Sequence, residues 1–344
     1  MPSGSGSDDA TLFAGTVDGV WCLTDGGETV DRVLAAGSGP VRVWRVVRGR
    51  EAVYAATDAG LFRSTDEGYS WEDLSVPAAP VFAVAVAPDG TVHAGTHPPR
   101  AYTLRDGTWT QRESLRDQPS REEWDSPVHD EGQVRHLEVP PSVPDRLVAG
   151  VERGGVHVSD DRGTTWAERR DGVHDDVHHL EFVDADTCVA ATGAGLYRTD
   201  DAGRSWTRLD GATGRSYFRE TLVHDGRLYA AATAGPSTTW RGPDGADAAL
   251  FESDDGGETL RSIPYPGGGR KAVLAWAVDG RRVLAGTDRG RVLVRRSDGW
   301  ETLATVPAGI RSMTVVRPMT RGAHRRSIRR FGPGRDRRNA DGPP

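Results

Sequence analysis

The 344-residue sequence predicts an all-β fold, a single seven-bladed β-propeller of four-stranded antiparallel blades. Two observations predict it. A unit of two β-like runs and an Asp/Gly turn, closed by tryptophan in its best copies, recurs seven times, and the 40 residues from Trp166 to Trp206 match the length of one blade. No segment shows sustained helical periodicity, whereas the 43 glycines and 21 prolines are typical of a protein of short strands and turns.

The turn in this unit follows the pattern Ser/Thr-x-Asp-x-Gly-x-x-Trp. Its clear copies lie at 64–71, 159–166 and 199–206, and its weaker copies at 24–30, 106–109, 253–260 and 297–300. The aspartate of such a turn can accept N–H groups of the turn itself, and glycine supplies the positive φ that the turn requires, at Gly68, Gly163, Gly203 and Gly257. The tryptophans are large apolar plugs beside the hairpin. We therefore expect structural roles for Asp25, Asp66, Asp161, Asp201, Asp255, Asp298, Trp71, Trp166 and Trp206.

This pattern resembles the Asp-box, or BNR, repeat of sialidases, sortilin/VPS10-type receptors and photosystem-assembly-factor-like propellers. The resemblance covers nearly all of residues 11–317. It implies a propeller fold whose Asp turns lie at the blade edge, away from the active face. Because these families include enzymes, receptors and scaffolds, the resemblance implies little about function.

A short apolar strand lies between each turn and the next alanine-rich run, and we expect it to be the innermost strand of a blade. The seven are 41–47, 81–86, 134–139, 177–183, 217–223, 272–278 and 310–316. The chain starts with a second strand near Leu12 and ends with an innermost strand, so we expect the C-terminal strand to pair beside the N-terminal three and close the ring. The predicted domains are a tail at 1–10, the propeller at 11–317 and a basic tail at 318–344.

Composition points to a cytoplasmic, monomeric protein. The N-terminus has neither a basic start nor an apolar stretch, so it is not expected to be a secretory signal, and no apolar run approaches the length of a membrane span. Cys22 and Cys188 are the only cysteines, lie far apart in the chain and show no zinc spacing. We expect no cofactor and no membrane partner.

The charge of the chain is unevenly distributed. Residues 318–344 carry eight arginines against two aspartates, so residues 1–317 have a net charge near −13 although the whole chain has −7. With Lys271 as the only lysine, this composition resembles that of proteins from salt-loving archaea, and a GC-rich genome is the other explanation of arginine over lysine. We expect the basic tail to be disordered without a specific role. The alternatives are an arm for a polyanion and a spurious end, and nucleic acid is an unlikely partner of so acidic a body.

Two connections are long enough to carry function. Residues 110–132 include Trp124, and residues 235–249 include Trp240. Both should lie on the top face, where the loops lead into the innermost strands and where propellers generally bind ligands. The first connection is expected to be either a lid over the channel, with Trp124 as a recognition aromatic, or a plain surface insertion.

Polar residues gather near the starts of the innermost strands and could share one cavity in the channel. The candidate ligand-binding residues are Arg42, Arg135, His136, His178, His179, Arg219 and Arg311, together with Trp124. His174, Asp175, Asp176, His178 and His179 have the side chains of a zinc or manganese site. Because adjacent strand residues point to opposite faces, His178 and His179 cannot reach one ion without a bulge, and we expect no metal.

The resemblance to sialidases implies a sharper alternative. Those enzymes hold a substrate carboxylate with three arginines and use a tyrosine nucleophile, a glutamate and an acid/base aspartate. Arg135, Arg219 and Arg311 match the first role, and Tyr217, Glu220 and Asp175 or Asp176 are the candidate catalytic residues. Six blades and an Arg-Ile-Pro segment are typical of sialidases and are missing from this sequence. Seven-bladed xyloglucan-cleaving enzymes carry such repeats too, but their cleft lies between two propellers.

The function expected is therefore a non-catalytic Asp-box propeller that binds a ligand or protein partner on its top face. The alternative is a glycoside hydrolase, sialidase-like and acting on an acidic glycan at the mouth of the channel. An enzyme needs a Tyr/Glu or Asp/Glu pair in a concave site, whereas a binding module needs only a charged or aromatic patch.

Overall fold

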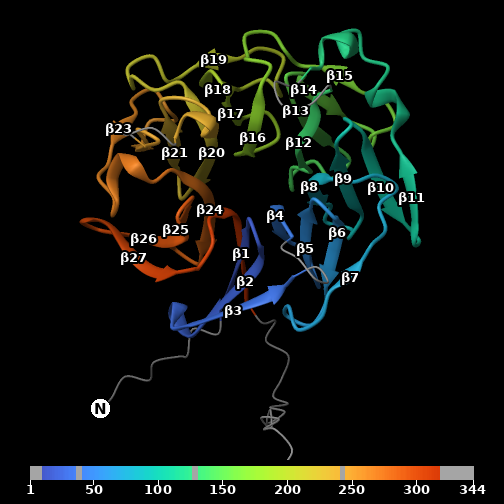
Figure 1. Cartoon of the computed structure of the whole chain (residues 1–344). Helices are drawn as coiled ribbons and strands as arrows, with labels where there is room; N and C mark the ends of the chain where they lie inside the picture. Colours follow the sequence, from blue (N-terminus) through green and yellow to red (C-terminus); the bar gives the residue numbers. More distant parts are fainter. Residues whose placement is uncertain (1–9, 36–40, 126–130, 241–244, 318–344) are drawn as a thin grey trace, which may run out of the picture.

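Seven four-stranded antiparallel sheets surround a central channel in the computed structural model (Figure 1). The structure describes residues 10–35, 41–125, 131–240 and 245–317. The predicted fold class is confirmed, and the five short helices are 3₁₀ turns of three residues each. No helix among these residues has the length and apolar character that crossing a membrane requires. The expectations for the basic tail at 318–344, and for all but the last residue of the N-terminal tail, fall outside the described residues.

Each blade runs from an innermost strand at the channel to an outer strand at the rim, and we number the blades along the chain. Blade 1 contains β28 (Ile310–Val316), β1 (Thr11–Thr16), β2 (Gly19–Thr24) and β3 (Thr29–Leu34). Blade 2 contains β4 (Val43–Arg48), β5 (Val53–Thr57), β6 (Gly60–Ser64) and β7 (Glu72–Asp73), and blade 3 contains β8 (Val81–Val86), β9 (Val92–Thr96), β10 (Ala101–Arg105) and β11 (Thr108–Gln111).

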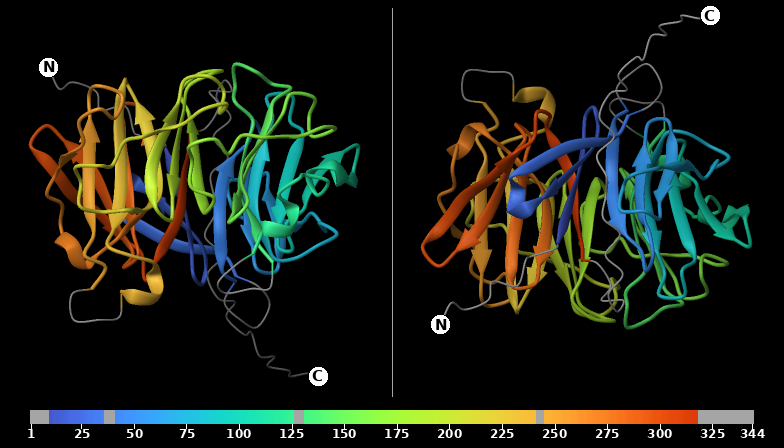
Figure 2. Two further views of the ribbon diagram at one scale, coloured as in Figure 1. Left: turned by 90° about the horizontal axis from the view of Figure 1, so that it is seen from above. Right: turned by 90° about the horizontal axis from the view of Figure 1, so that it is seen from below.

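The remaining four blades repeat this order. Blade 4 contains β12 (Gln133–Glu138), β13 (Leu147–Glu152), β14 (Gly155–Ser159) and β15 (Ala167–Glu168); blade 5 contains β16 (Val177–Phe182), β17 (Cys188–Thr192), β18 (Gly195–Thr199) and β19 (Thr207–Arg208). Blade 6 contains β20 (Tyr217–His224), β21 (Arg227–Thr233), β22 (Ala249–Ser253) and β23 (Arg261–Ser262); blade 7 contains β24 (Val273–Asp279), β25 (Arg282–Thr287), β26 (Arg291–Arg296) and β27 (Gly299–Thr305). The side views in Figure 2 show the strands running along the channel axis.

The ring closes by pairing the two ends of the described chain. Strand β28 lies antiparallel to β1, with Thr11 opposite Val316 and Ala14 opposite Met313. This confirms the predicted closure of the C-terminal strand beside the N-terminal three. The pairing covers the edge of β1 that would otherwise be open to a strand of another chain, and β28 takes the innermost position of the blade.

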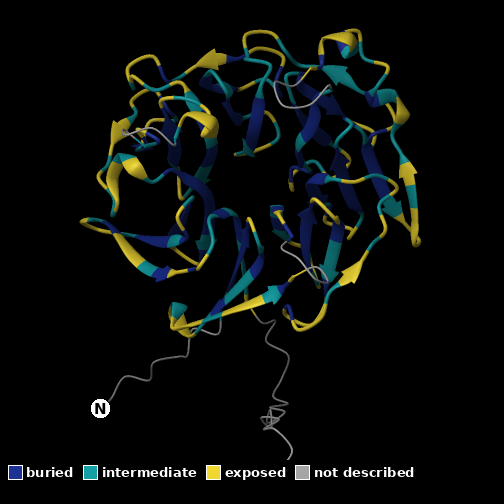
Figure 3. Ribbon diagram, viewed as in Figure 1, coloured by how far each residue is buried: buried dark blue, intermediate teal, exposed yellow. Residues whose placement is uncertain are grey.

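The core lies between neighbouring blades, and small residues on the second strands let the blades approach. A Cβ on Gly15 would lie 2.7 Å from side-chain atoms of both Val43 and Val46, and one on Gly150 would lie 2.7 Å from Val177. Alanines occupy other second strands for the same reason, among them the fully buried Ala56. Figure 3 shows the result as buried inner strands and an exposed rim of outer strands and turns.

The turns at the bottom of the blades contain the hydrogen bonds that the sequence predicts. Asp161 accepts hydrogen bonds from the Thr165 N–H at 2.8 Å and from the Ser159 hydroxyl at 2.8 Å. Asp66, Asp201 and Asp255 accept the equivalent pairs in their own turns. The four glycines have φ between 83° and 101°, and Trp206 is buried and donates its indole N–H to the Arg169 carbonyl of the preceding blade at 3.1 Å. The aspartates therefore tie each of these four turns together, and Trp206 also links its turn to the preceding blade.

The weaker copies of the turn differ in a systematic way. Asp298, in one of the weaker copies, lies in a two-residue hairpin turn rather than in a full Asp turn, because Arg296 pairs with Gly299. Asp25 keeps a reduced version and accepts the Thr29 hydroxyl at 3.1 Å. Outer strands after a full Asp turn are two residues long, whereas those after a shortened copy have four to seven. The long turn thus uses residues that otherwise extend the outer strand.

Candidate functional site

Every innermost strand contains a β-bulge one residue after its first buried apolar residue. The pairing shifts between Val43 and Arg45 in β4, and at the equivalent position of each other innermost strand. A bulge turns two successive side chains toward the same side of a strand. The seven extra residues are Trp44, Phe82, Arg135, His178, Arg219, Leu274 and Arg311.

Six of these seven bulge residues line one pocket at the top of the channel. Trp44, Phe82, Arg135, His178, Arg219 and Arg311 line it, together with Arg45 and Glu220, which directly follow the bulge in their strands. The pocket is therefore built by the fold from equivalent positions of six blades. Leu274 of blade 7 is instead buried against Ala246, Ala248 and Trp240, so the second insertion covers the seventh position.

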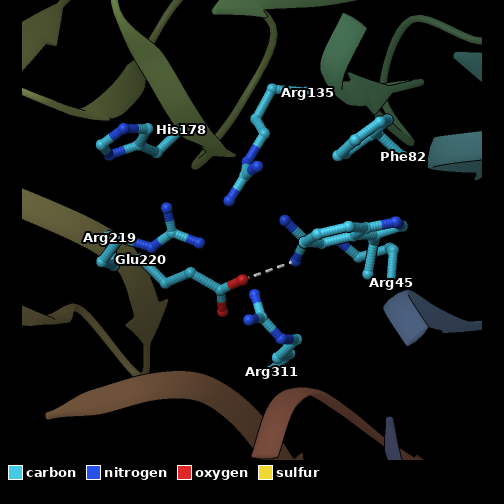
Figure 4. Close-up of a pocket in the computed structure, with 8 residues that line it drawn as sticks. Arg45, Phe82, Arg135, His178, Arg219, Glu220 and Arg311 are labelled. Carbon is cyan, nitrogen blue, oxygen red and sulfur yellow. Dashed lines mark ion pairs between the residues drawn. The ribbon is translucent and has the colours of Figure 1, made fainter. Parts of the chain in front are cut away.

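Four guanidinium groups surround a single carboxylate in this pocket (Figure 4). Glu220 extends to the centre, and Arg45 reaches it from the far side of the channel with an Nη1–Oε1 distance of 2.9 Å. Arg135 approaches from blade 4 and also forms an ion pair with Glu152 at 3.4 Å. With four arginines against one lining glutamate, the pocket carries an excess of positive charge.

Burial and mutual repulsion act on these arginines. Burial, followed by the charges of Arg219, Arg135 and Arg42, lowers the pKa of Arg311 to about 9. Burial and the neighbouring Arg219 also lower the pKa of Arg135. The buried Nε–H of Arg311 donates to no acceptor among the described residues. A guanidinium that is desolvated and crowded by like charges favours an added anion.

An aromatic wall borders the arginines. The rings of Trp44 and Phe82 stack with centroids 4.5 Å apart, and Arg311 lies over the Trp44 ring at 4.9 Å. Arg42 and Arg135 also approach this ring, at 5.4 and 5.8 Å. The indole face thus holds guanidinium groups in place through cation–π contacts, without using the N–H groups that an anion would bind.

Strand β16 contains a bulge at His178, which is the condition under which His178 and His179 could approach one ion. The Nδ1 of His178 donates to the Phe218 carbonyl at 2.6 Å, and its Nε2 lies 3.3 Å from Asp176. The ring of His179 packs edge-on against His136 at 4.6 Å. No three His, Cys, Asp or Glu side chains of the described part of the chain are arranged to hold a metal ion.

Below the arginines a chain of polar contacts continues down the channel. Arg45 Nη2 lies 3.4 Å from His136 Nδ1, whose Nε2 lies 3.2 Å from Glu138. Since a guanidinium can only donate, Nδ1 is the acceptor and Nε2 carries the hydrogen. Burial raises the pKa of Glu138 well above its usual range, and burial raises that of Glu181 to about 7 with a contribution from Glu220.

The structure brings together most, but not all, of the predicted site residues. Arg135, Arg219, Arg311, His178 and Glu220 share the pocket, and His136 and His179 lie just below it. Arg42 is exposed and is not among the lining residues, although it lies over the ring of Trp44, which is. Trp44, Arg45 and Phe82 were not predicted. Aligning the innermost strands on the apolar residue before the bulge would have found them, since Trp44 and Phe82 follow Val43 and Val81 as Arg135 follows Val134.

The candidate catalytic residues do not converge. Among the described residues, the pocket lining includes neither Tyr217 nor Asp175 nor Asp176. Tyr217 packs on the His178 ring at 4.8 Å, and Asp175 points outward with a side chain 44% exposed. Asp176 is held by His178; burial acts to raise its pKa, but the contacts with His178, Arg135 and Arg219 lower it to about 2. Among the residues that the structure describes, Glu220 is therefore the one carboxylate in the pocket lining.

Trp124 is a core residue, and its predicted role as a recognition aromatic is wrong. It is 2% exposed, packs on His157 with centroids 4.7 Å apart and donates to Ser120 at 2.9 Å. Ser120 in turn binds Glu168 of blade 4. The described part of the 110–132 connection is thus anchored on the side of blade 4 rather than over the channel, as Figure 1 also shows.

Comparison with known proteins identifies the fold and nothing finer. No protein-family model and no curated protein matches the chain. Among solved structures, a GH74 enzyme of Niastella koreensis aligns with TM-score 0.57 and 17% identity over 76% of this chain and 45% of its own. The GH74 xyloglucanase of Xanthomonas campestris aligns with TM-score 0.56 and 20% identity over 85% and 46%.

Another structural neighbour is a propeller with a bound peptide rather than a named enzyme. YCF48 bound to D1 peptide aligns with TM-score 0.55 and 16% identity over 77% of this chain and 84% of its own. The present chain spans less than half the length of the two GH74 enzymes. The propeller fold therefore has neighbours among both glycoside hydrolases and binding propellers.

Proposed function

We propose that this protein is a binding module whose channel mouth takes an anionic group of a ligand or protein partner presented from the top face. The convergence of Arg45, Arg135, Arg219 and Arg311 on one pocket carries this proposal. A guanidinium fork matches a carboxylate or phosphate with two parallel hydrogen bonds. Donors from four blades can surround such a group on several sides, and the buried setting strengthens each contact.

The size of the pocket limits what can enter it. The cavity among the lining side chains has a volume of about 20 Å³. This is little more than one water molecule needs. The space left beside Glu220 admits at most the tip of a small anionic head group, and the rest of the ligand stays outside the mouth. A carboxylate of a peptide or of an acidic glycan is such a group, and the exposed Arg42 at the rim is placed to contact what lies above.

A binding role agrees with the families that the repeat pattern resembles. The sequence resembles sortilin-type and assembly-factor propellers, and the structure of YCF48 contains a bound peptide. For this chain a protein partner with an exposed acidic group remains part of the proposal. An excess of negative charge on the body would favour presentation of that group through the positive channel mouth rather than through the sides.

The glycoside hydrolase alternative is less well supported. Hydrolysis of a glycosidic bond by this chemistry needs two acidic groups, or a tyrosine with its glutamate, at the bond. Glu220 is the only acidic side chain lining the described pocket, and Arg45 holds it in an ion pair. Three arginines that could hold a sialic acid carboxylate are present, so sialosides belong in any ligand screen.

Calorimetric titration with N-acetylglycine and with its neutral amide tests the proposal. In buffer of low chloride the carboxylate should bind and the amide should not, because only the former matches the arginines. Arg311→Met should weaken binding about tenfold or more, as expected for hydrogen bonds to a charged group. Arg63→Met is the matched control, since Arg63 lies on β6 and pairs with Glu72. Equal binding of acid and amide, or no effect of Arg311→Met, would contradict the proposal.

A further inference from the structure

The centre of the arginine cluster already contains an anion, the carboxylate of Glu220. Figure 4 shows this group between the guanidiniums of Arg45, Arg135, Arg219 and Arg311, at the position where an incoming carboxylate would be held. Glu220 is 7% exposed, and its Oε1 lies 2.9 Å from Nη1 of Arg45. The small free volume of the pocket follows directly, because the side chain fills the space that four arginines enclose.

The groups around Glu220 can be assigned blade by blade. Positive charge comes from Arg311 of blade 1, Arg45 of blade 2, Arg135 of blade 4 and Arg219 of blade 6 itself. Blade 5 contributes His178 to the pocket and Glu181 below it, and the carboxyls of Glu181 and Glu220 repel each other. Two further carboxylates lie beside the cluster, Glu152 next to Arg135 and Asp176 next to His178. Blades 3 and 7 contribute the apolar residues Phe82 and Leu274 at this level. The environment is that of a bound anion.

We propose that Glu220 is a built-in occupant of the arginine cluster, and that an external carboxylate binds by taking its place. This inference rests on the proposed function and adds how the site is regulated. The displaced carboxyl takes up a proton from the solvent and turns away from the guanidiniums, while the ligand carboxylate forms the contacts that Glu220 gave up. The Glu220 carboxyl and the ligand carboxylate are therefore not both ionised when the ligand is bound.

The direction of the pH effect follows from this exchange. Burial raises the pKa of Glu220, although Arg45, Arg219 and Arg135 act to lower it. Below that pKa the carboxyl is neutral and releases the arginines. The affinity for an anion that stays ionised throughout should therefore increase as the pH falls, and binding above that pKa should be accompanied by uptake of one proton.

Glu220→Gln tests the inference with methanesulfonate, which remains ionised across the pH range used. The glutamine has the same shape and no charge, so the affinity should rise about tenfold at pH 7 and lose most of its pH dependence. Glu72→Gln is the matched control, because it removes one exposed negative charge on β7, far from the channel. Unchanged or weaker binding by Glu220→Gln would overturn the inference.

A second measurement needs no variant and so does not depend on whether Glu220→Gln folds. The binding heat of the wild-type protein, measured in buffers of different ionisation enthalpy, reports the protons taken up. Uptake approaching one proton at pH 7 supports the exchange, and no uptake overturns it. Absence of anion binding by both wild type and Glu220→Gln would instead overturn the proposed function, whereas binding by the variant alone would support both.

Discussion

Arg45 and Glu220 form an ion pair across the channel, 2.9 Å between Nη1 and Oε1, from blades that are not neighbours in the ring. The two side chains are 14% and 10% exposed, so the pair is largely withdrawn from water. It joins blade 2 to blade 6 directly. The same two residues line the pocket, so the link that spans the ring is also part of the candidate site.

Removing one member of this pair should destabilise the ring. Arg45→Met leaves Glu220 buried with one counter-ion fewer, and breaking such a pair costs roughly 3 kcal/mol. The double variant Arg45→Met/Glu220→Gln should lose less than the sum of the single changes, because each change removes the partner that the other would leave without its ion pair. Urea unfolding of the four proteins measures the coupling. Strictly additive losses would show that the pair does not act as a unit.

Blades 1 and 2 lie so close together that a methyl group added at Gly15 should destabilise the fold. Gly15→Ala would place Cβ 2.7 Å from Val43 and Val46, and overpacking of this kind costs roughly 1–3 kcal/mol. Gly211→Ala is the control, since a Cβ there meets nothing within 4 Å. Thermal unfolding of both variants decides the point, and equal melting temperatures would mean that the two blades are less tightly packed than described.

The Asp turns predict a loss of stability that depends on pH. In Asp161, burial acts to raise the pKa, but hydrogen bonds from Thr165 and Ser159 outweigh it and lower the pKa. A carboxylate with a depressed folded pKa stabilises the fold above the unfolded value of 3.8, and that contribution disappears as the pH falls through the folded value. Asp161→Asn should therefore lower the urea midpoint at pH 6, and this effect should shrink as the pH falls below 3.8. The exposed Glu122, changed to Gln, is the control.

The channel glutamates predict the opposite dependence. Burial, with the charge of Glu220, raises the pKa of Glu181 to about 7. Between pH 4.5 and 7 the folded protein keeps a proton that the unfolded chain releases, so this group lowers stability as the pH rises through that window. Relative to wild type, the free energy of unfolding of Glu181→Gln should therefore be higher at pH 7 than at pH 5. If the difference in free energy of unfolding between variant and wild type were the same at pH 5 and pH 7, Glu181 would be ionised at both.

The repeat made the architecture predictable from sequence. The innermost strands at 81–86 and 310–316 were predicted with the bounds that the structure has, and the closure through β28 followed from the order of strands along the chain. Each depends on local patterns, namely apolar runs and turn residues. The shortened turn at Asp298 escaped prediction because two- and seven-residue turns share the same Asp-Gly letters.

The site was predictable only in part, for a physical reason. Arg135, Arg219 and Glu220 were identified because charged residues at strand starts are conspicuous, whereas Trp44 and Phe82 look like ordinary core residues. The bulges decide which residues share the pocket, and a bulge has no clear sequence signature. Trp124 shows the reverse error, since an aromatic among charges looked exposed but is buried by contacts with a neighbouring blade.

The most direct test of the central claim, that the channel mouth holds an anionic group, is a crystal structure grown in bromide at pH 5 and at pH 8. At pH 5 we expect an anomalous bromide peak within hydrogen-bond distance of at least two of Arg135, Arg219 and Arg311, with Glu220 turned away. At pH 8 the Glu220 carboxylate should occupy that place. Bromide bound only elsewhere at pH 5, with Glu220 still among the arginines, would contradict the account.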